Sequence, residues 1–294
     1  MKALENNIKD VIIDTDTFNE IDDQFAVAYA LHSTDEADVK AIYAAPFYNP
    51  KVKSAEEGME KSYDEIKKLL LLAGADKEVY KGSREYLPDE KTPVISDAAK
   101  DLVERAKKYS PVKPLYVVAI GAITNIASAV LLSPEIVNNI VVVWLGGHAH
   151  HYCDTKEFNM IQDVAAARVV MKRCVNFVQL PCIGVVDAFR VSCAELEKFY
   201  MGKNELSDYL AKNVIEEVKT YRQDEMWSRV IWDVTAVAYL LRDDEKFMKS
   251  RKVRVRLPDY NGFYEDETDK IITCVYHIER DELFEDMTKR ITEK

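Results

Sequence analysis

The chain alternates short apolar runs with segments in which apolar residues recur every three or four positions. Residues 115–120 and 140–145 are mostly Val, Ile and Leu, which is typical of buried strands, and residues 123–132 between them have the length and spacing of a helix. Ser133-Pro134 ends that helix. Because neighbouring parallel strands need a helical crossover, the pattern predicts a βαβ unit. The predicted fold class is α/β, a single domain over residues 1–294 with a central, mostly parallel β-sheet flanked by helices.

The same two patterns predict the other elements. Residues 54–74 indicate an amphipathic helix that begins with Ser54 and Glu57 in a capping arrangement, and a second one begins near Ser96. Further strands are expected at residues 10–13, 39–45, 177–180, 253–257 and 271–276. Further helices are expected at residues 22–31, 164–172, 194–219, 231–241 and 282–291. A polar excursion at residues 259–269 is expected to separate the last two strands.

Composition and charge exclude several classes of protein. The formal net charge is −11, from 51 acidic and 40 basic residues, which argues against a nucleic-acid partner. The apolar runs are far shorter than the ~20 residues of a membrane span, so no membrane partner is expected. The N-terminus lacks the apolar stretch of a secretory signal, so a cytoplasmic protein is expected. Five cysteines without a C-x-x-C pair suit reduced, mostly buried thiols.

Four aspartates crowd the turn that follows the first predicted strand: Asp14, Asp16, Asp22 and Asp23. Since strand side chains alternate, Asp14 and Asp16 point to the same side, at the edge where open α/β sheets bind ligands. Asp22 and Asp23 follow in the first turn of a helix. Like charges this close need a cation or the positive end of a helix, and carboxylate oxygens suit Ca²⁺ or Mg²⁺. The turn therefore predicts a divalent metal site.

Two other interpretations of this turn stay open. In the simpler one, Asp22 and Asp23 only favour the helix N-terminus, and Asp14 and Asp16 are polar residues that end a strand. In the other, the turn resembles the nucleophile motif of haloacid-dehalogenase-type phosphatases, in which the first aspartate is phosphorylated and the second is an acid and base. That motif requires a later lysine and an acidic pair after a strand. No convincing pair follows, and Asp22 and Asp23 would be unexplained.

Further fragments follow the acidic turn in a fixed order along the chain. They are Ala41 to Asn49, Gly121 to Ala127, Leu145 to Gly147 with Glu157 to Asn159, and Trp232 to Leu240. Together with the four acids, this series resembles the calcium-dependent nucleoside hydrolases of the inosine/uridine-preferring type. The turn is two residues longer than the family's Asp-x-Asp-Pro-Gly-x-Asp-Asp motif and lacks Pro-Gly. The resemblance extends from residue 11 to residue 241.

The resemblance implies an activity and a metal site. The activity is hydrolysis of the N-glycosidic bond of ribonucleosides, or of a related riboside, through a Ca²⁺-held water and a ribosyl cation-like transition state. It also implies a small-molecule nucleoside or riboside as partner and a homodimer or homotetramer. Four groups would hold Ca²⁺: the carboxylates of Asp16, Asp23 and Asp233, and the main-chain carbonyl of Thr124. Asp16 would also take the proton of the attacking water, and Asp14 would support the ligands from behind.

The resemblance also implies how the ribose is held. Asp22 would accept a hydrogen bond from the 2′-hydroxyl. Asn49, Glu157 and Asn159 would bind the remaining hydroxyls with oxygens that face the developing positive charge, which gives Asn159 a catalytic role as well. Each of these residues could instead serve a loop, a turn or a helix cap.

One departure from the family pattern affects the leaving group. The family usually places His before the last metal-binding Asp, whereas this chain has Trp232. An indole can stack on a nucleobase but cannot protonate it. The candidates for a substitute acid are His148, His150, His151, Tyr221, Arg222 and Glu225. A family member that binds a ribosyl ligand without turnover is the alternative that this departure favours.

Overall fold

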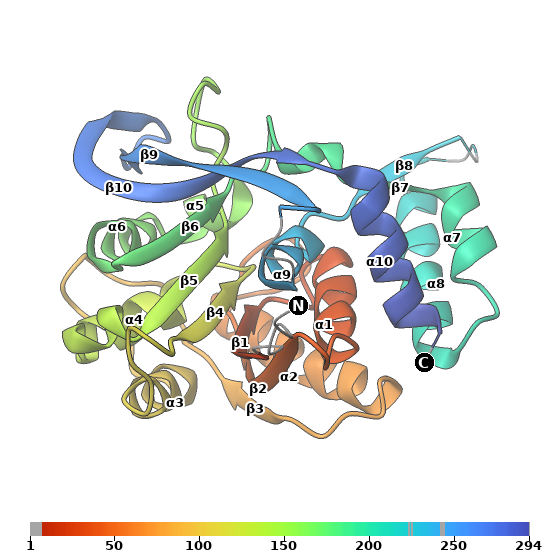
Figure 1. Cartoon of the computed structure of the whole chain (residues 1–294), viewed down its shortest axis with the longest axis horizontal. Coiled ribbons are helices and arrows are strands. Elements are labelled where there is room, and N and C mark those ends of the chain that lie inside the picture. Colours follow the sequence, from red (N-terminus) through yellow and green to blue (C-terminus); the bar gives the residue numbers. More distant parts are fainter. Residues whose placement is uncertain (1–7, 223, 225, 242–244, 294) are drawn as a thin grey trace, which may run out of the picture.

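A computed structural model describes residues 8–222, 224, 226–241 and 245–293 (Figure 1). Its centre is an eight-stranded sheet with the strand order β3-β2-β1-β4-β5-β6-β10-β9. The strands are β1 (Lys9–Thr15), β2 (Ala37–Ala44), β3 (Glu78–Lys81), β4 (Leu115–Ala119), β5 (Ile140–Leu145), β6 (Asn176–Leu180), β9 (Met248–Pro258) and β10 (Tyr264–Ile278). Neighbouring strands are parallel except for the antiparallel hairpin β9–β10. The predicted α/β class with a mostly parallel central sheet is confirmed.

Helices cover both faces of this sheet (Figure 1). One face carries α3 (Asp97–Ala106), α4 (Thr124–Leu132) and α6 (Val164–Arg173), and the other carries α1 (Asp22–Leu31), α2 (Ala55–Leu72) and α9 (Val234–Leu241). Each face has its own cluster of buried apolar side chains. Successive residues of β1 serve both clusters, since Ile12 belongs to one and Ile13 to the other. Burial on both faces explains why the central strands are almost continuously apolar.

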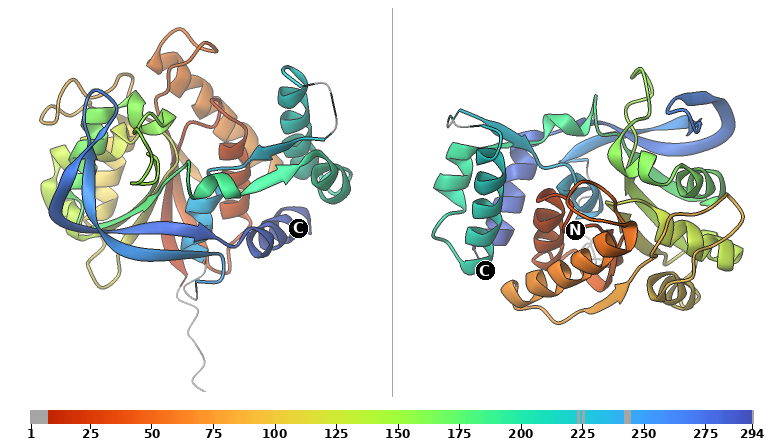
Figure 2. Two further views of the ribbon diagram at one scale, coloured as in Figure 1. Left: turned by 90° about the horizontal axis from the view of Figure 1, so that it is seen from above. Right: turned by 180° about the vertical axis from the view of Figure 1, so that it is seen from behind.

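The remaining elements lie around this sandwich. α7 (Cys193–Phe199), α8 (Glu205–Lys219) and α10 (Arg280–Thr292) gather at one end of the molecule, and the tip of the β9–β10 hairpin lies toward the other end (Figure 2). The short elements are α5 (Phe158–Gln162), the 3₁₀ helices η1 (Pro134–Asn138) and η2 (Val186–Ala188), and the two-stranded sheet of β7 (Arg190–Ser192) and β8 (Ser228–Val230).

Two sequence expectations differ from the structure, and three short strands were not expected. The helix expected at residues 194–219 is two helices, because Gly202 takes a left-handed φ of 72° and Asn204 caps α8. The polar excursion at residues 259–269 is only a short turn, and its second half belongs to β10. Charged residues are tolerated there because this part of the strand is largely exposed and Glu267 lies opposite Arg256. β3, β7 and β8 were not predicted, because runs of three or four residues show no periodicity.

The strand order places a crevice at the end of β1. From β1 the chain builds outward through β2 and β3 on one side, and through β4, β5 and β6 on the other. At such a reversal the loops after the two central strands diverge, and ligands bind at the carboxyl ends of the strands. The acidic turn follows β1 at this point.

The thiols agree with the sequence prediction. Cys174, Cys182, Cys193 and Cys274 are buried, Cys153 is exposed, and all five are free. Within the described ranges, no helix combines the length and the apolar character that a bilayer crossing requires.

Candidate active site

The turn between β1 and α1 brings three of the four predicted aspartates together, Asp16, Asp22 and Asp23. β1 ends at Thr15 and α1 begins at Asp22, so the turn is six residues long and both ends of it carry acids. All four carboxyl groups are buried, with Asp14, Asp16, Asp22 and Asp23 at most 1% exposed. The amide of Asp16 donates to Asp23 Oδ1 over 3.2 Å, and the Thr15 hydroxyl donates to the same oxygen. These bonds fasten the end of the strand to the first turn of the helix.

The loop after β4 forms a neighbouring wall. Gly121 approaches the turn so closely that a Cβ added to it would lie 3.0 Å from Asp16 Oδ1. Glycine at this position therefore leaves room for the Asp16 carboxylate, since a larger residue would displace it.

Asp233 completes the cluster from a distant part of the chain. It directly precedes α9, which packs against α1. Asp22, Asp23 and Asp233 each place one carboxyl oxygen within 4.8 Å of the others. The amide of Trp232 donates to Asp22 Oδ2 over 3.0 Å, which links the two segments directly.

Burial and mutual repulsion disfavour the charged forms of these carboxyl groups. Burial, and next the charge of Glu20, raise the pKa of Asp22 to about 7. Burial together with the neighbouring acids raises the pKa values of Asp16, Asp23 and Asp233 well above their usual range. Both carboxyl oxygens of Asp16 and Oδ1 of Asp22 are buried without a hydrogen-bond partner among the described residues. A bound cation would satisfy these oxygens, and a set of oxygen donors alone suits Ca²⁺ or Mg²⁺.

The acidic cluster lies at one side of a cavity of ≈ 250 Å³. Seven of the predicted site residues line it: Asp16, Asp22, Asp23, Glu157, Asn159, Trp232 and Asp233. The cavity is also lined by residues that were not predicted as site residues: Asn19, Glu20, Ile120, Leu145, Lys156, Phe158, Cys182 and Ile183. Asn19 and Glu20 lie within the acidic turn, so their position was a usable signal, whereas nothing in the local sequence marks Cys182 or Ile183.

Glu157 and Asn159 reach the cavity through local backbone bonds. Glu157 caps α5, and its carboxylate accepts from the amides of Asn159 and Met160 over 2.8 and 2.9 Å and from that of Gly147 over 2.8 Å. Burial outweighs these bonds and raises the pKa of Glu157 to about 6. The Asn159 side-chain amide donates to the carbonyls of Ile120 and Leu145, where the loops after β4 and β5 begin. Because its N–H groups are used in this way, the amide oxygen is the part of Asn159 available to a ligand.

Three predicted residues do not line the cavity: Asn49, Thr124 and Asp14. Asn49 donates to Asn19 Oδ1 over 2.8 Å and accepts from the Lys51 amide, so among the described residues Asn19 links its side chain to the cavity. Thr124 is buried at the start of α4, and its hydroxyl donates to Asp163 Oδ2 over 2.8 Å. Its carbonyl stays a predicted ligand.

Asp14, which is predicted to support the metal ligands from behind, is held by a residue of α4. It is buried and accepts from Asn125 Nδ2 over 2.8 Å. It does not belong to the cavity lining.

The chain matches the sequence model of one family, inosine-uridine preferring nucleoside hydrolase, over residues 11–283. The chain belongs to this family. It is 27% identical over 224 residues to the probable uridine nucleosidase 2 of Arabidopsis thaliana, a match that covers 69% of this chain and 68% of the relative.

Solved structures of nucleoside hydrolases have the same fold. A plant nucleoside hydrolase superposes with a TM-score of 0.78 at 19% identity, covering 97% of this chain and 99% of that one. A purine-preferring ribonucleoside hydrolase from Gardnerella vaginalis superposes with a TM-score of 0.75 at 19% identity, covering 97% and 98%. The nucleoside hydrolases are N-glycosidases, so the chain is a member of an enzyme family of that class.

The structure separates the candidate acids of this nucleoside hydrolase. His148 lines the cavity, whereas His150 and His151 line a different one beside the β9–β10 hairpin. Tyr221 is 63% exposed and Arg222 is exposed and paired with Asp224, and neither lines the cavity. Glu225 lies outside the described residues.

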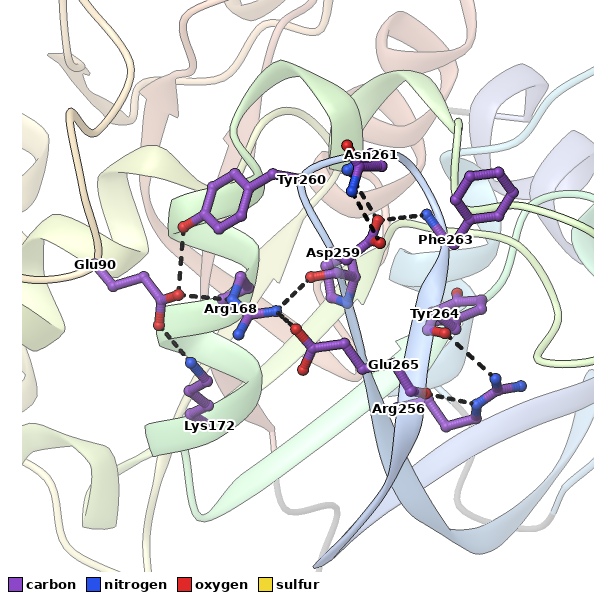
Figure 3. Close-up of polar contacts among 11 residues, drawn as sticks. Glu90, Arg168, Lys172, Arg256, Asp259, Tyr260, Asn261, Phe263, Tyr264 and Glu265 are labelled. Carbon is purple, nitrogen blue, oxygen red and sulfur yellow. Dashed lines mark hydrogen bonds and ion pairs between the residues drawn. The ribbon is translucent and has the colours of Figure 1, made fainter.

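The β9–β10 hairpin is tied to the helical layer by an ion-pair network (Figure 3). Arg168 of α6 bonds to Glu90 Oε1 and to Glu265 Oε1, both over 2.6 Å, and donates to the Pro258 carbonyl. Lys172 pairs with Glu90 as well, and the Tyr260 hydroxyl donates to Glu90 Oε1 over 3.3 Å. The network fixes the hairpin tip relative to α6.

The fixed hairpin in turn holds the loop of residues 146–157, which forms part of the cavity. The Tyr264 hydroxyl donates to the carbonyl of His148 over 2.7 Å, and Arg256 donates to that of His150 over 2.9 Å. The amide of Thr155 donates to the Gly262 carbonyl over 2.8 Å. These bonds act on backbone atoms, so they set the path of the loop that carries His148 and Glu157.

Proposed function

We propose that this family member is a Ca²⁺-dependent hydrolase of ribonucleosides or of a related riboside, and that it cleaves the N-glycosidic bond through a ribosyl cation-like transition state. The observation that carries the proposal is a set of four buried carboxyl groups at the strand-order reversal: Asp16, Asp22, Asp23 and Asp233. Three of their oxygens lack any partner in the described structure. The phosphatase alternative is not carried forward, because the chain belongs to a family of N-glycosidases.

The donor set fits a calcium ion. The ligands would be Asp16, Asp23, Asp233 and the Thr124 carbonyl, and Asp22 is close enough to Asp23 and Asp233 to share the field of the ion. When bound, Ca²⁺ neutralises the buried carboxylates and orients water and ribose hydroxyls. Raised pKa values in the metal-free protein are the expected consequence of removing such a cation.

The residues of the chain supply the remaining chemistry. Asp16 takes a proton from the attacking water, since it is buried in the cavity lining and both of its oxygens are free of other bonds. Asp22 accepts a hydrogen bond from the ribose 2′-hydroxyl through its unpartnered Oδ1. The Asn159 amide oxygen stabilises positive charge as it develops on the sugar.

Glu157, Asn49 and Trp232 supply the remaining parts of this proposal. Glu157 binds a ribose hydroxyl with lone pairs not used by the three amides that it accepts. Asn49 holds Asn19 at the rim of the cavity. Trp232 offers a flat apolar surface for the base. A cytoplasmic homodimer or homotetramer remains the expected form.

A reducing-sugar assay with uridine, inosine and p-nitrophenyl riboside tests the proposal. Activity should disappear in EDTA and return with Ca²⁺. Asp16→Asn should lower kcat by about 10²–10⁴-fold, the usual contribution of a general base. Cys153→Ser, which alters an exposed residue outside the cavity, is the matched control.

Two results would contradict the proposal. Full activity of Asp16→Asn would remove the assigned base. Binding of nucleosides in calorimetry without release of sugar from any of the three substrates would establish the binding-only role that Trp232 favours.

A further inference from the structure

The cavity is rich in hydrogen-bond acceptors and poor in donors. Six of its side chains are carboxylates: Asp16, Glu20, Asp22, Asp23, Glu157 and Asp233. Such a surface suits ribose, whose hydroxyl groups can donate to carboxylates. A departing nucleobase has the opposite requirement, because it takes both electrons of the C1′–N bond and gains negative charge. It needs a hydrogen-bond donor.

Three of the other side-chain donors in the cavity lining are already engaged. The side-chain amide of Asn159 donates to two main-chain carbonyls. The Cys182 thiol bonds to Glu157. The Lys156 stem packs beside Gly262, and its ammonium lies 5.6 Å from the centre of the Phe263 ring at the hairpin tip. His148 is different.

Three contacts hold His148 in one orientation. The amide of Ile183 donates to its Nδ1 over 3.3 Å, the Tyr264 hydroxyl binds its carbonyl over 2.7 Å, and the Tyr152 ring lies edge-on at 4.8 Å between centroids. Because Nδ1 accepts a hydrogen bond, the neutral ring carries its proton on Nε2. Asp154 Oδ1 lies 3.9 Å from Nε2, beyond hydrogen-bond distance. The Nε2–H group is therefore a fixed donor without a partner among the described residues.

We propose that His148 donates a hydrogen bond from Nε2–H to the leaving nucleobase, in a chain where Trp232 replaces the histidine that the family usually has. The inference rests on the proposed function. As the C1′–N bond breaks, its electron pair leaves with the base, and the hydroxide part of the attacking water bonds to C1′. The water's proton goes to Asp16, and the base takes a proton from solvent. His148 stays neutral throughout, as a donor that does not release its proton.

The electrostatic surroundings of His148 agree with a neutral ring. Burial lowers the pKa of His148 more than the charges of Asp154 and Asp187 raise it. This direction would be unfavourable for an imidazolium acid, but it favours a hydrogen-bond donor that works near neutral pH.

The experiment compares two kinds of leaving group. The nitrophenolate of p-nitrophenyl riboside leaves without assistance, whereas the bases of uridine and inosine do not. We expect His148→Phe to lower kcat/KM for the better nucleoside by about 10²–10³-fold, as for loss of one preorganised donor. The same variant should lower kcat/KM for p-nitrophenyl riboside by less than about threefold. His148→Gln keeps an N–H donor and should recover at least about tenfold of the loss on the nucleoside.

The control is His151→Phe, an exposed residue of the same loop that does not line the cavity. It should match the wild type on both substrates, and the melting temperature of each variant reports on folding. Equal loss on both substrates, as expected for a residue that holds the ribose or the loop, would overturn the inference. Retention of full nucleoside activity in His148→Phe would overturn it as well. If the wild type cleaves none of the substrates, the proposed function itself has failed, and the inference fails with it.

Discussion

Asp14 offers a direct test of the electrostatics of the site. Its carboxyl group is buried, Oδ1 accepts one hydrogen bond from Asn125, and Oδ2 has no partner in the described structure. Burial raises the pKa of Asp14 to about 7 from an ordinary 3.8. We therefore expect the change that Asp14→Asn makes in the free energy of unfolding of the metal-free protein to be more favourable at pH 8 than at pH 5. The same substitution should weaken Ca²⁺ binding.

The magnitude follows from the pKa. One pKa unit corresponds to about 1.4 kcal/mol, so ionising Asp14 within the folded, metal-free protein costs about 4 kcal/mol above pH 7. The pKa of Asp14 is higher in the folded than in the unfolded state, so its protonated form contributes to the free energy of unfolding. This contribution is complete below about pH 4 and is lost as the pH rises to about 7. Between pH 5 and pH 8 the loss is about 3 kcal/mol. The unpartnered amide of Asn adds a cost of about 1–3 kcal/mol that does not depend on pH.

Urea unfolding in EDTA at pH 5, 6, 7 and 8, followed by tryptophan fluorescence, measures the cost of ionising Asp14 in the folded protein. The free energy of unfolding of Asp14→Asn relative to wild type should rise by about 3 kcal/mol across the range. Calorimetric titration with Ca²⁺ at pH 8 should show about 10–100-fold weaker binding, as is usual when a group supporting metal ligands is changed.

Asp10→Asn is the matched control on the same strand. Asp10 pairs with Lys40 at 3.0 Å and accepts from the Tyr109 hydroxyl at 3.1 Å. Its replacement should cost up to about 1 kcal/mol at pH 8 and bring no gain. A difference between Asp14→Asn and wild type that stays constant from pH 5 to pH 8 would refute the argument, because only an ionisation cost changes with pH.

Two further predictions follow from the metal site and the hairpin. Ca²⁺ should raise the melting temperature of EDTA-treated protein more at pH 8 than at pH 5. The pKa values of Asp16, Asp23 and Asp233 are raised, so protons must leave these carboxyl groups before the ion binds. An equal rise in melting temperature at both pH values would argue against these ligands. Tyr264→Phe should destabilise the fold by about 1 kcal/mol and lower the melting temperature by about 2 °C, because the His148 carbonyl loses its donor. Tyr260→Phe is the control. It loses a 3.3 Å hydrogen bond to Glu90 at the surface and should lower the melting temperature by less.

The sequence by itself determined the class of fold and the position of the acidic turn. Apolar runs and helical spacing are local properties, so they identified β1, α1, β4, α4 and β5 as consecutive elements of a parallel sheet. Alternation along β1 placed Asp14 and Asp16 on one side of the strand end, and the start of α1 placed Asp22 and Asp23 in the next helical turn, which was enough to predict an acidic site here. The ordered fragments added Asp233 and Asn159, which no local pattern could join to that turn.

The tertiary structure decided which of the remaining candidates meet in the cavity. Three histidines lie within four residues of one another, and only the path of the loop, set by Tyr264 and Arg256 of the hairpin, turns His148 toward the cavity and His150 and His151 toward another. Asn49 was placed in the site by sequence, but in the described part of the chain its side chain is linked to the cavity through a hydrogen bond to Asn19. Such outcomes depend on contacts between residues that are 116 and 106 positions apart in the chain. Periodicity fixes the face on which a side chain lies, but the register and loop closure that set its neighbours are properties of the whole fold.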